Sequence, residues 1–562
     1  MRVNIIYNAK STGLHQDAYL LSGMLVVALG KDVKILHVPH FHPQCEEAEI
    51  NFFIESINPS LFVYASKNIL IPNPEWTFQS WKPYLRMFDE IWVKTKGAID
   101  IFANEGIATK YIGWTSVDKM LPPKKDYNQA IVPVGKNSWR HPKPIIQAYM
   151  RIQKSNLEMF TSLPVVHIVH NLELPPIPEE VSTKFMVHKG VMPVAEYDKL
   201  VQECGLMIST SACEGFCHAV NEGMSAGCTL ILSPIDAHSE LSDLARFTSQ
   251  SASIPHPECL GRLMDVSVPS IIACLSAYLT ENNRTKKEKT IKFRQEYETR
   301  HEKFLETLDS SIRELVKDMP PYSLQEKLPK ESDLPHVSVI TITRDRRAFI
   351  PLAKYCFIAQ SYPPEKLEWI IMDDGDDQIK DLVSDIPNAR YFLSDEKMTI
   401  GAKRNEAISK ASYDVIVMMD DDDVYPNNSI LTRVANMLAE PRKECLFSTV
   451  IPCYEIHEKK SFMNSPPMKL TMSERVSEAT LCFTRDFWNN RKFPDKQIGE
   501  AGDFITGRET QCREFSPQDI IVSLIHRKNT SSRKPPAMET NGCHYGFSDE
   551  LFTLVSEIGE RI

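Results

Sequence analysis

The sequence predicts an α/β protein in which two lobes of strands and helices are followed by a separate third α/β domain. Short runs rich in Val and Ile alternate with segments of helical length, which is typical of parallel sheets covered by helices. A length of 562 residues is too great for one hydrophobic core. Acidic clusters follow several predicted strands, where open α/β sheets bind their ligands.

The first two domains are predicted to be Rossmann-like lobes. Residues 1–125 carry apolar runs at RVNIIYNA, DVKILHVP, SLFVYAS, EIWVKT and TKYIGWT, and PPKKD ends this series. Residues 126–317 repeat the pattern at QAIVPVG, PVVHIVHN, KFMVHKG, GLMISTS and TLILSP, and they end in a charged segment with a helical pattern. We expect two parallel sheets with helices on both faces, followed by a linker over residues 318–335.

The third domain is predicted over residues 336–535. Its strands are HVSVITIT, LEWIIMDD, ARYFLSD and YDVIVMMD, again separated by segments of helical length. Residues 536–562 show weak patterning and are expected to form an appended helix or tail.

Composition and charge exclude several classes of function. A net charge of −10 argues against nucleic acid as the main partner, because phosphate-backbone binding normally requires a basic face. The apolar run from Ala18 to Gly30 is too short to span a bilayer and lacks the features of a signal peptide, so it predicts a buried helix and no transmembrane segment. Thirteen cysteines without metal-like spacing indicate reduced thiols in a cytoplasmic protein.

Four consecutive aspartates, Asp420 to Asp423, follow the strand YDVIVMM. Carboxylates so close together repel one another unless a cation lies between them, and their oxygens suit Mg²⁺ or Mn²⁺. Such an ion can stabilise a diphosphate leaving group. Gly401 in TIGAKRNEAISKA is expected to open a helix whose amides, with Lys403 and Arg404 in the first turn, suit phosphate oxygens.

The acidic clusters lie in a longer pattern. VSVITITRDRR, AQSYPPEKLEWIIMDDGDD and TIGAKRNEAISKASYDVIVMMDDDDVYP resemble the inverting family-2 glycosyltransferases of GT-A fold, over about Val337 to Arg533. The resemblance implies a GT-A domain with a mixed, mostly parallel sheet. Asp345 departs from it, since the family usually has Asn after the first strand.

The same resemblance implies the roles of individual residues. Asp373 and Asp374 would contact the nucleotide base. Asp420 and Asp422 would form an Asp-x-Asp element that holds the ribose and the metal, with Asp423 beside them.

An inverting transferase needs a general base for the acceptor hydroxyl. Family members place it in a downstream Glu-Asp element, and QIGEAGDFITGR offers both Glu500 and Asp503. Spacing does not choose between them, although Glu500 is preferred. His526 is a candidate metal or phosphate ligand, and an ordinary core or surface histidine is the alternative.

The sharpest pattern in the first two lobes is STSACEGFCHAVNEGMSAG. On a helix, Glu214 and Glu222 would lie up to about 12 Å apart, too far for a close acid–base pair but suited to two ends of one extended ligand. The helix N-terminus is expected at Gly215 and Phe216, facing phosphates, and Gly227 is expected to end the helix.

The surrounding run, FMVHKG to TLILSP, resembles the C-terminal lobe of retaining family-4 glycosyltransferases of GT-B fold. The resemblance implies that Glu222 binds the donor ribose and that Glu214 lies on the sugar side. VPVGKNSWRHPKPIIQAY resembles the family's basic strand–loop–helix, with Arg140 and Lys143 as candidates for neutralising the diphosphate. No cofactor is expected in this half, where these cations and the helix dipole would stabilise the leaving group.

Two further segments concern substrate binding. The polar loop NAKSTGLHQDA, with Gly13, lies where such enzymes approach the acceptor. The aromatic residues of Asn73 to Trp81 allow stacking on a sugar, but core packing is the favoured interpretation.

The sequence thus predicts a bifunctional glycosyltransferase, in which a retaining GT-B module precedes a metal-dependent inverting GT-A module. The donors would be UDP- or GDP-linked sugars and the acceptor a glycan or glycoconjugate. One alternative keeps only the C-terminal domain catalytic and makes the GT-B-like part a glycan-binding or scaffolding module. A nucleotidyltransferase that uses the aspartates is a third, less favoured possibility.

Overall fold

The structure is a computed structural model that describes the whole chain except residues 41, 43–44, 138, 172, 323–328, 468, 518 and 530–546, and the side chains of residues 250–252. The chain divides into two compact units. The N-terminal unit comprises Met1–His40, Glu49–Ile57 and Lys67–Pro321, and the C-terminal unit comprises Phe41–Ala48, Asn58–Ser66 and Tyr322–Ile562.

The first lobe of the N-terminal unit is a six-stranded sheet in the order β2-β1-β3-β4-β5-β6. Its pairs β1–β2, β1–β3, β4–β5 and β5–β6 are parallel. The strands are β1 (Arg2–Tyr7), β2 (Lys34–Pro39), β3 (Ala48–Ile54), β4 (Ala65–Ile71), β5 (Glu90–Val93) and β6 (Lys110–Tyr111), and its longer helices are α1 (Thr12–Leu29) and α3 (Lys96–Ala103).

Two expectations for this lobe were wrong in part. The run SLFVYAS does not form a strand, because Asn58 caps and Pro59 opens a 3₁₀ helix, η1 (Pro59–Tyr64), and the strands are β3 and β4 on either side of it. The apolar run in α1 is helical as predicted, but it is not buried on all sides. Leu21 and Leu25 face the core, while Tyr19 and Val27 are exposed.

The second lobe is a parallel sheet in the order β12-β11-β10-β7-β8-β9. It is followed by the antiparallel hairpin β13–β14. The strands are β7 (Asp126–Gly135), β8 (Val165–His170), β9 (Phe185–Lys189), β10 (Cys204–Ser209), β11 (Thr229–Leu232), β12 (Arg246–Phe247), β13 (Gln250–Pro255) and β14 (Arg262–Val266). The main helices are α4 (Lys143–Ser155), α7 (Val194–Glu203), α8 (His218–Ser225) and α10 (Val268–Thr280).

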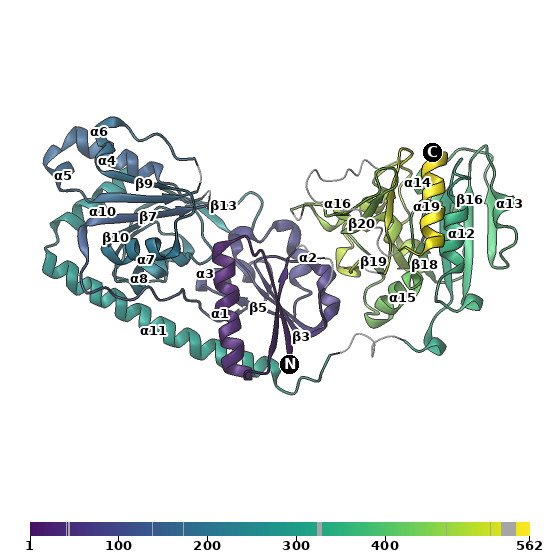
Figure 1. Cartoon of the computed structure of the whole chain (residues 1–562), viewed down its shortest axis with the longest axis horizontal. Helices are drawn as coiled ribbons and strands as arrows, with labels where there is room; N and C mark the ends of the chain where they lie inside the picture. Colours follow the sequence, from purple (N-terminus) through teal and green to yellow (C-terminus); the bar gives the residue numbers. More distant parts are fainter. Residues whose placement is uncertain are drawn as a thin grey trace. The chain divides into compact units, whose positions relative to one another are not determined.

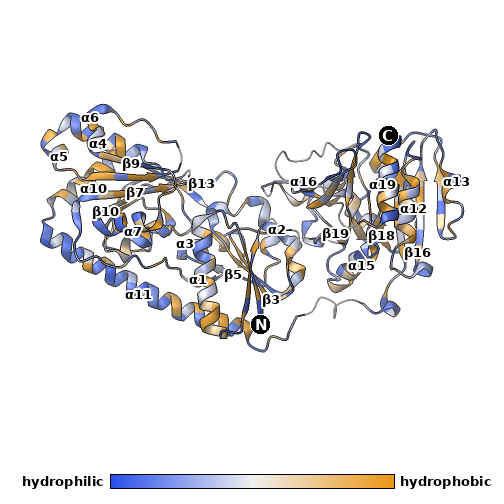
Figure 2. Ribbon diagram, viewed as in Figure 1, coloured by the Kyte–Doolittle hydropathy of each residue, from blue (hydrophilic) through white to orange (hydrophobic). Residues whose placement is uncertain are grey.

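Helix α11 (Asn283–Val316) joins the two lobes. It is the predicted charged helix and is largely hydrophilic in Figure 2, in contrast to the apolar strands. Its first half places Phe293 and Tyr297 in the core of the second lobe, and its second half places Phe304, Leu308 and Ile312 in the core of the first. The chain therefore returns to the first lobe after completing the second (Figure 1).

The C-terminal unit holds a mixed seven-stranded sheet in the order β17-β16-β15-β18-β22-β19-β23 and a small sheet β21-β20-β24. Strand β22 runs antiparallel to β18 and β19, and the other pairs of the large sheet are parallel. The large sheet comprises β15 (Val337–Thr343), β16 (Leu367–Asp373), β17 (Ala389–Leu393), β18 (Val415–Met418), β19 (Cys445–Phe447), β22 (Cys482–Thr484) and β23 (Cys512–Glu514). The small sheet comprises β20 (Ile451–Glu455), β21 (Lys460–Asn464) and β24 (Ser523–Ile525).

The helices of this unit include α12 (Ile350–Ile358), α14 (Ile400–Ser409), α15 (Ser429–Ala439), α17 (Arg485–Asn490), α18 (Glu500–Ile505) and the last element, α19 (Asp549–Arg561). The predicted α/β class with two parallel-sheet lobes and a mixed C-terminal sheet is confirmed. Residues 530–533, at the end of the family-2 resemblance, lie outside the described residues.

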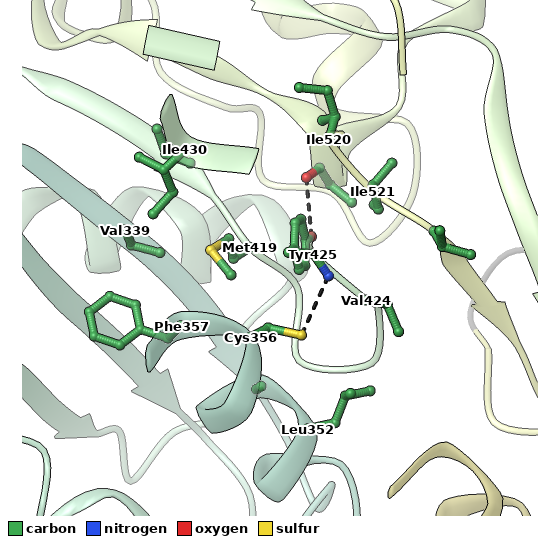
Figure 3. Packing of buried hydrophobic residues seen from close by; sticks show 14 of the residues in the cluster. Val339, Leu352, Cys356, Phe357, Met419, Val424, Tyr425, Ile430, Ile520 and Ile521 are labelled. Carbon is green, nitrogen blue, oxygen red and sulfur yellow. Dashed lines mark hydrogen bonds between the residues drawn. The ribbon is translucent and has the colours of Figure 1, made fainter. Parts of the chain in front are cut away.

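The four aspartates are flanked by Met419, Val424 and Tyr425, which belong to a buried hydrophobic cluster (Figure 3). The Tyr425 amide donates to Cys356 Sγ at 3.4 Å, and the Asp420 amide donates to Tyr425 Oη at 2.7 Å. Arg433, which is fully buried, donates to the Met418 carbonyl at 2.7 Å. The backbone of the acidic turn is therefore fixed by the core.

Candidate functional site

A pocket of about 320 Å³ lies at the carboxyl ends of β15 and β18. Its wall includes Arg346, Lys403, Arg404, Asp420 to Asp423 and Glu500. The sheet topology brings these residues together from four separate segments of the chain. The pocket therefore contains most of the residues that the sequence predicts for the C-terminal domain.

The aspartates of this pocket have different partners. Asp422 accepts hydrogen bonds from Arg346 and from His526 Nε2, the latter at 3.2 Å. Burial raises the pKa of Asp422, but the hydrogen bond from His526 and the charge of Arg346 outweigh burial and lower it. Burial and the neighbouring carboxylates instead raise the pKa of Asp421. Asp423 accepts from the Leu524 amide at 2.9 Å, which ties the turn to β24.

Two carboxylate oxygens remain available for a ligand. Asp420 Oδ1 and Asp421 Oδ2 are buried and have no hydrogen-bond partner within the described part of the chain. Asp420 Oδ1 lies 3.5 Å from Arg404 Nη1. Hard oxygen atoms on one or two carboxylates fit Mg²⁺ or Mn²⁺, although the described residues contain no group of three or more His, Cys, Asp or Glu side chains placed to hold a metal.

His526 lies behind the pocket and does not line it. Its side chain is fully enclosed, and it contacts Asp422 as described above. The neighbouring Lys528 amide donates to its Nδ1 at 3.2 Å. His526 therefore contacts two residues that line the pocket, Asp422 and Asn529, and the Asn529 amide nitrogen lies 3.1 Å from its Nε2.

Helix α14 begins at Ile400, with Thr399 as its N-cap, one residue earlier than predicted. Its first amides are not free for phosphate, because Gly401 donates to the Lys496 carbonyl at 3.0 Å and Ala402 donates to Thr399 Oγ1. Any side chain at Gly401 would collide with the Pro494 carbonyl oxygen, so the close approach requires glycine.

The two basic residues of α14 are already paired. Lys403 donates to Asp374 and, at 3.0 Å, to the Thr343 carbonyl. Arg404 lies between two pocket acids, with Nε 3.1 Å from Glu500 and Nη1 3.5 Å from Asp420. Both cations line the pocket from buried positions.

Asp373 and Asp374 do not line the pocket. Asp373 accepts from the Gly375 amide at 2.9 Å and from Tyr391 Oη at 2.8 Å. Asp374 accepts from Arg344, Lys403 and the Met398 amide, and its side chain is completely buried. These two carboxylates hold neighbouring segments in place in this structure.

The two candidate bases differ in position. Glu500, the first residue of α18, is buried and lines the pocket. Asp503 is about half exposed, pairs with Lys496 and does not line the pocket. The structure therefore separates two residues that the sequence leaves as alternatives.

The N-terminal unit contains a larger cleft of about 1310 Å³, lined by residues of both lobes. Among the predicted residues, its lining includes Gly13, Arg140, Glu214, Gly215, Phe216 and Glu222. Lys143 is absent from the lining and exposed at the start of α4, whereas Lys136 and Lys119 do line the cleft. Most of the polar segment around Gly13 is helical, because α1 begins at Thr12.

Arg140 and Glu214 form an ion pair in which Glu214 is buried and Arg140 is partly exposed. Arg140 Nε lies 2.5 Å from Glu214 Oε1 and Nη2 lies 3.1 Å from Oε2, while Ser211 Oγ donates to Oε1 at 2.5 Å. Burial raises the pKa of Glu214, but the guanidinium outweighs burial and lowers it. The guanidinium expected to face the diphosphate is therefore engaged by the glutamate expected on the sugar side.

Helix α8 starts at His218, so the expected helix N-terminus at Gly215 and Phe216 was wrong by two residues. Cys217 adopts a positive φ of 66° just before the helix, which delays its start. The helix ends as predicted. Gly227 has φ 74°, its amide donates to the Met224 carbonyl, and the next amide donates to the Gly223 carbonyl.

Glu222 lies near Lys119, with 3.7 Å between Oε1 and Nζ, and accepts from Gln16 at 3.4 Å. Burial raises its pKa. Sequence analysis missed Lys119 and the buried Asp17, which accepts from Trp114 at 2.5 Å and contacts His218 at 2.8 Å. For Asp17 the only signal in the sequence was its place in the polar NAKSTGLHQDA segment. Its partner His218 belongs to the motif that contains Glu214 and Glu222. No pattern in the sequence marks Lys119.

Residues 338–499 match a family model described as glycosyl transferase family 2. This range contains the acidic turn and α14, and Glu500 follows it directly. The C-terminal unit therefore contains a glycosyltransferase domain. The match covers the C-terminal domain only, and no curated protein matches the sequence.

Several solved structures are similar to parts of this chain. A mannosyltransferase from Pyrobaculum calidifontis in complex with GDP-Man and Mn²⁺ has 15% identity and a TM-score of 0.28, over 36% of this chain and 60% of that one. S. aureus TarS 1-349 in complex with UDP-GlcNAc has 15% identity and a TM-score of 0.27, over 34% and 59%. A trehalose-6-phosphate synthase structure has 10% identity and a TM-score of 0.41, over 57% and 100%. The chain spans about 60% of the length of the first two.

The described helices include none that is long and apolar enough to cross a membrane. The twelve cysteines in the described part of the chain are all free thiols.

Proposed function

We propose that the chain is a bifunctional glycosyltransferase that moves sugars from nucleotide-sugar donors to a glycan or glycoconjugate acceptor. The C-terminal domain would act with inversion and a divalent metal, and the N-terminal unit would act with retention and without a metal. The pocket in which Arg404 links Asp420 to Glu500, inside a family-2 domain, carries the proposal.

In the C-terminal pocket, Glu500 is proposed as the general base, because it lines the pocket from a buried position while Asp503 does not line the pocket and pairs with Lys496. A base at this place would take the proton of the attacking hydroxyl. Arg404 would hold Glu500 and Asp420 at a fixed separation. Lys403 would face the donor phosphates once its position is set by Asp374.

Mn²⁺ or Mg²⁺, when bound, would stabilise the charge that develops on the leaving diphosphate. Asp420 and Asp421 fit this ion best, because each has a buried oxygen without a partner among the described residues. Asp423 would hold the turn in place through its hydrogen bond to β24. Asp422 would add negative charge beside the ion, and His526 would hold the Asp422 side chain.

In the N-terminal cleft, Glu222 is proposed to bind the donor ribose and Glu214 to lie beside the sugar. Lys119 and Lys136, which line the cleft, would join Arg140 in neutralising the diphosphate. Gly13 and the start of α1 would lie on the acceptor side of the same cleft.

One observation favours the alternative of a non-catalytic N-terminal module. The guanidinium of Arg140 is paired with Glu214, so a diphosphate would have to compete for it. In that case the N-terminal unit would bind glycan and only the C-terminal domain would transfer sugar.

The two proposals are separated by variants of the full chain. Diphosphate release would be screened with UDP- and GDP-sugars, with and without Mn²⁺, for the wild type, for Asp420→Ala with Asp422→Ala, and for Glu222→Ala. We expect the aspartate variant to abolish the metal-dependent activity and Glu222→Ala to abolish a metal-independent one. If the aspartate variant removes all transfer, the N-terminal unit is not a transferase. If it removes none, the proposed C-terminal mechanism is wrong.

A further inference from the structure

The segment Asn73–Trp76 faces the cleft of the N-terminal unit. The sequence favours core packing for the aromatic residues from Asn73 to Trp81, and Trp81 is indeed buried. Asn73, Glu75 and Trp76, however, all line the cleft, together with Glu55 at the end of β3. The proposed function gives none of these four residues a role.

Two polar atoms of this segment lack partners. Glu55 accepts a hydrogen bond from Asn73 Nδ2 at 2.5 Å, which orients the Asn73 amide. Asn73 Oδ1 and Glu75 Oε2 are buried and have no hydrogen-bond partner among the residues that the structure describes. The exposed fractions of Asn73 and Glu75 are only 8% and 3%. Buried polar atoms without hydrogen-bond partners are unfavourable, so both atoms are suited to a ligand that forms hydrogen bonds with them, such as one with hydroxyl groups.

The segment is held in place by the second lobe. The loop of the β13–β14 hairpin donates from the Gly261 amide to the Pro74 carbonyl at 3.0 Å and from the Leu260 amide to the Thr77 carbonyl at 2.9 Å. The Gln79 amide donates in return to the Glu258 carbonyl at 2.8 Å. The unpartnered oxygens therefore belong to a site whose backbone is fixed before any ligand arrives.

Glycines bring the second lobe close to these side chains. A Cβ atom on Gly215 would lie 2.5 Å from Asn73 Oδ1, and one on Gly261 would lie 2.9 Å from the Glu75 Cα atom. Because Gly215 directly follows Glu214, Asn73 lies next to the glutamate proposed for the sugar side. The site thus adjoins the position proposed for the transferred sugar.

The charges around the site favour a neutral ligand. Burial raises the pKa of Glu75 to about 8 and that of Glu55 to about 7, and the charge of Glu55 adds to the rise at Glu75. Both side chains therefore carry a proton for much of the time near neutral pH. The nearest cations are engaged, since Arg140 pairs with Glu214 and Lys94 pairs with Asp17. Neither an anion nor a metal ion suits this arrangement, whereas a polyhydroxylated ring does.

We propose that Asn73 and Glu75, with Glu55 as the residue that orients Asn73, bind two hydroxyl groups of a sugar ring in the cleft. The inference rests on the proposed function of the N-terminal unit, because it places this ring beside Glu214. The ring belongs either to the donor sugar or to the acceptor, which present the same hydroxyl chemistry.

Saturation-transfer NMR on the full chain tests the proposal. All variants would carry Asp420→Ala and Asp422→Ala and would be studied in a metal chelator. This minimises the contribution of the C-terminal pocket to the saturation-transfer signal. The probes are UDP-N-acetylglucosamine, UDP-glucose and GDP-mannose, and separately free glucose, galactose and mannose with UDP or GDP present. Asn73→Ala and Glu75→Leu are the test variants. Glu49→Gln is the matched control, because Glu49 is a buried glutamate of β3 that pairs with Arg2 outside the cleft.

Loss of one hydrogen bond in each test variant predicts sugar affinity up to about tenfold weaker, with an unchanged signal from the nucleoside protons and an unchanged control. If the test variants weaken only the saturation-transfer signal of the sugar protons in a nucleotide sugar, the site binds the donor. If they weaken only the signals of the free sugars, the site binds the acceptor. Unchanged sugar signals in correctly folded test variants would overturn the proposal.

The outcome also separates this site from the proposed function. If the wild type binds free sugars through Asn73 and Glu75 but binds no nucleotide sugar, the hydroxyl site stands and the retaining transferase does not. If neither free sugars nor nucleotide sugars receive saturation, the hydroxyl site and the proposed transferase function of the N-terminal unit are both wrong. Glu75→Gln, which keeps a polar group of the same shape, should restore part of the sugar signal if Glu75→Leu has lost it.

Discussion

Replacing Arg346 by glutamine should strengthen metal binding in the C-terminal pocket. Arg346 donates to Asp422 and lies 3.4 Å from Asp421, so its guanidinium neutralises the carboxylates that would receive a divalent ion. A metal that binds these aspartates must displace this cation or bind beside it, and either event costs free energy. Glutamine removes the positive charge and keeps a polar side chain in the pocket.

The size of the effect follows from the distance. At 3.4 Å and an effective dielectric constant of about 20, the attraction between Arg346 and Asp421 is about 5 kcal/mol. Desolvation of both groups offsets much of that attraction. A net gain of about 1.4–2.8 kcal/mol remains for the metal, which corresponds to affinity about 10- to 100-fold tighter.

Calorimetric titration of the free chain with Mn²⁺, without nucleotide, measures this affinity directly. Arg347→Gln is the matched control, because Arg347 comes from the same loop but pairs with Asp377 and Asp381 outside the pocket. We expect tighter binding for Arg346→Gln and no change for Arg347→Gln. Unchanged or weaker binding in Arg346→Gln would show that the metal is not held by these aspartates.

Three further predictions concern stability, measured by urea unfolding with hydrogen exchange followed separately in each unit. Arg140→Met should lower the free energy of unfolding by about 3–5 kcal/mol, because it leaves Glu214 buried and unpaired. The double variant Arg140→Met with Glu214→Gln should lose clearly less. Equal losses would mean that the two residues are not coupled. Gly401→Ala should cost about 1–3 kcal/mol through collision with the carbonyl it packs against, while Gly559→Ala, which meets only ordinary contacts, should be neutral or stabilising. Because the folded chain holds the Glu75 proton more tightly than the unfolded chain, the free energy of unfolding should fall as the pH rises from about 4.5 to about 8. Glu75→Gln should remove that part of the slope, and an identical pH profile for both proteins would contradict the burial argument.

Local patterns in the sequence were sufficient for much of the fold. Most predicted strands appear because a run of β-branched residues long enough to cross a sheet has few other stable conformations. The helical end at Gly227 was also predictable, since a positive φ at the position after a helix favours glycine. The error at η1 shows the limit, because a short apolar run after Pro59 suits a buried 3₁₀ turn as well as a strand.

The candidate sites divide in the same way. Placement of acids at the ends of strands could be predicted, and the pocket does contain Asp420 and Glu500. Which partners those acids take could not be predicted. Arg140 and Glu214 are 74 residues apart in sequence, and no local pattern links them.

The sequence by itself determined the fold class and the chemical character of the two sites, because both depend on residue types at local spacings. Only the tertiary structure decided which charges are neutralised, which of Glu500 and Asp503 reaches the pocket, and that Asn73 and Glu75 leave two acceptors unpartnered within the described residues. The physical reason is that ion pairs and buried hydrogen bonds depend on distances of a few ångströms between side chains. Those distances are set by how whole elements pack, as when α11 returns to the first lobe, and not by the residues next to them in the chain.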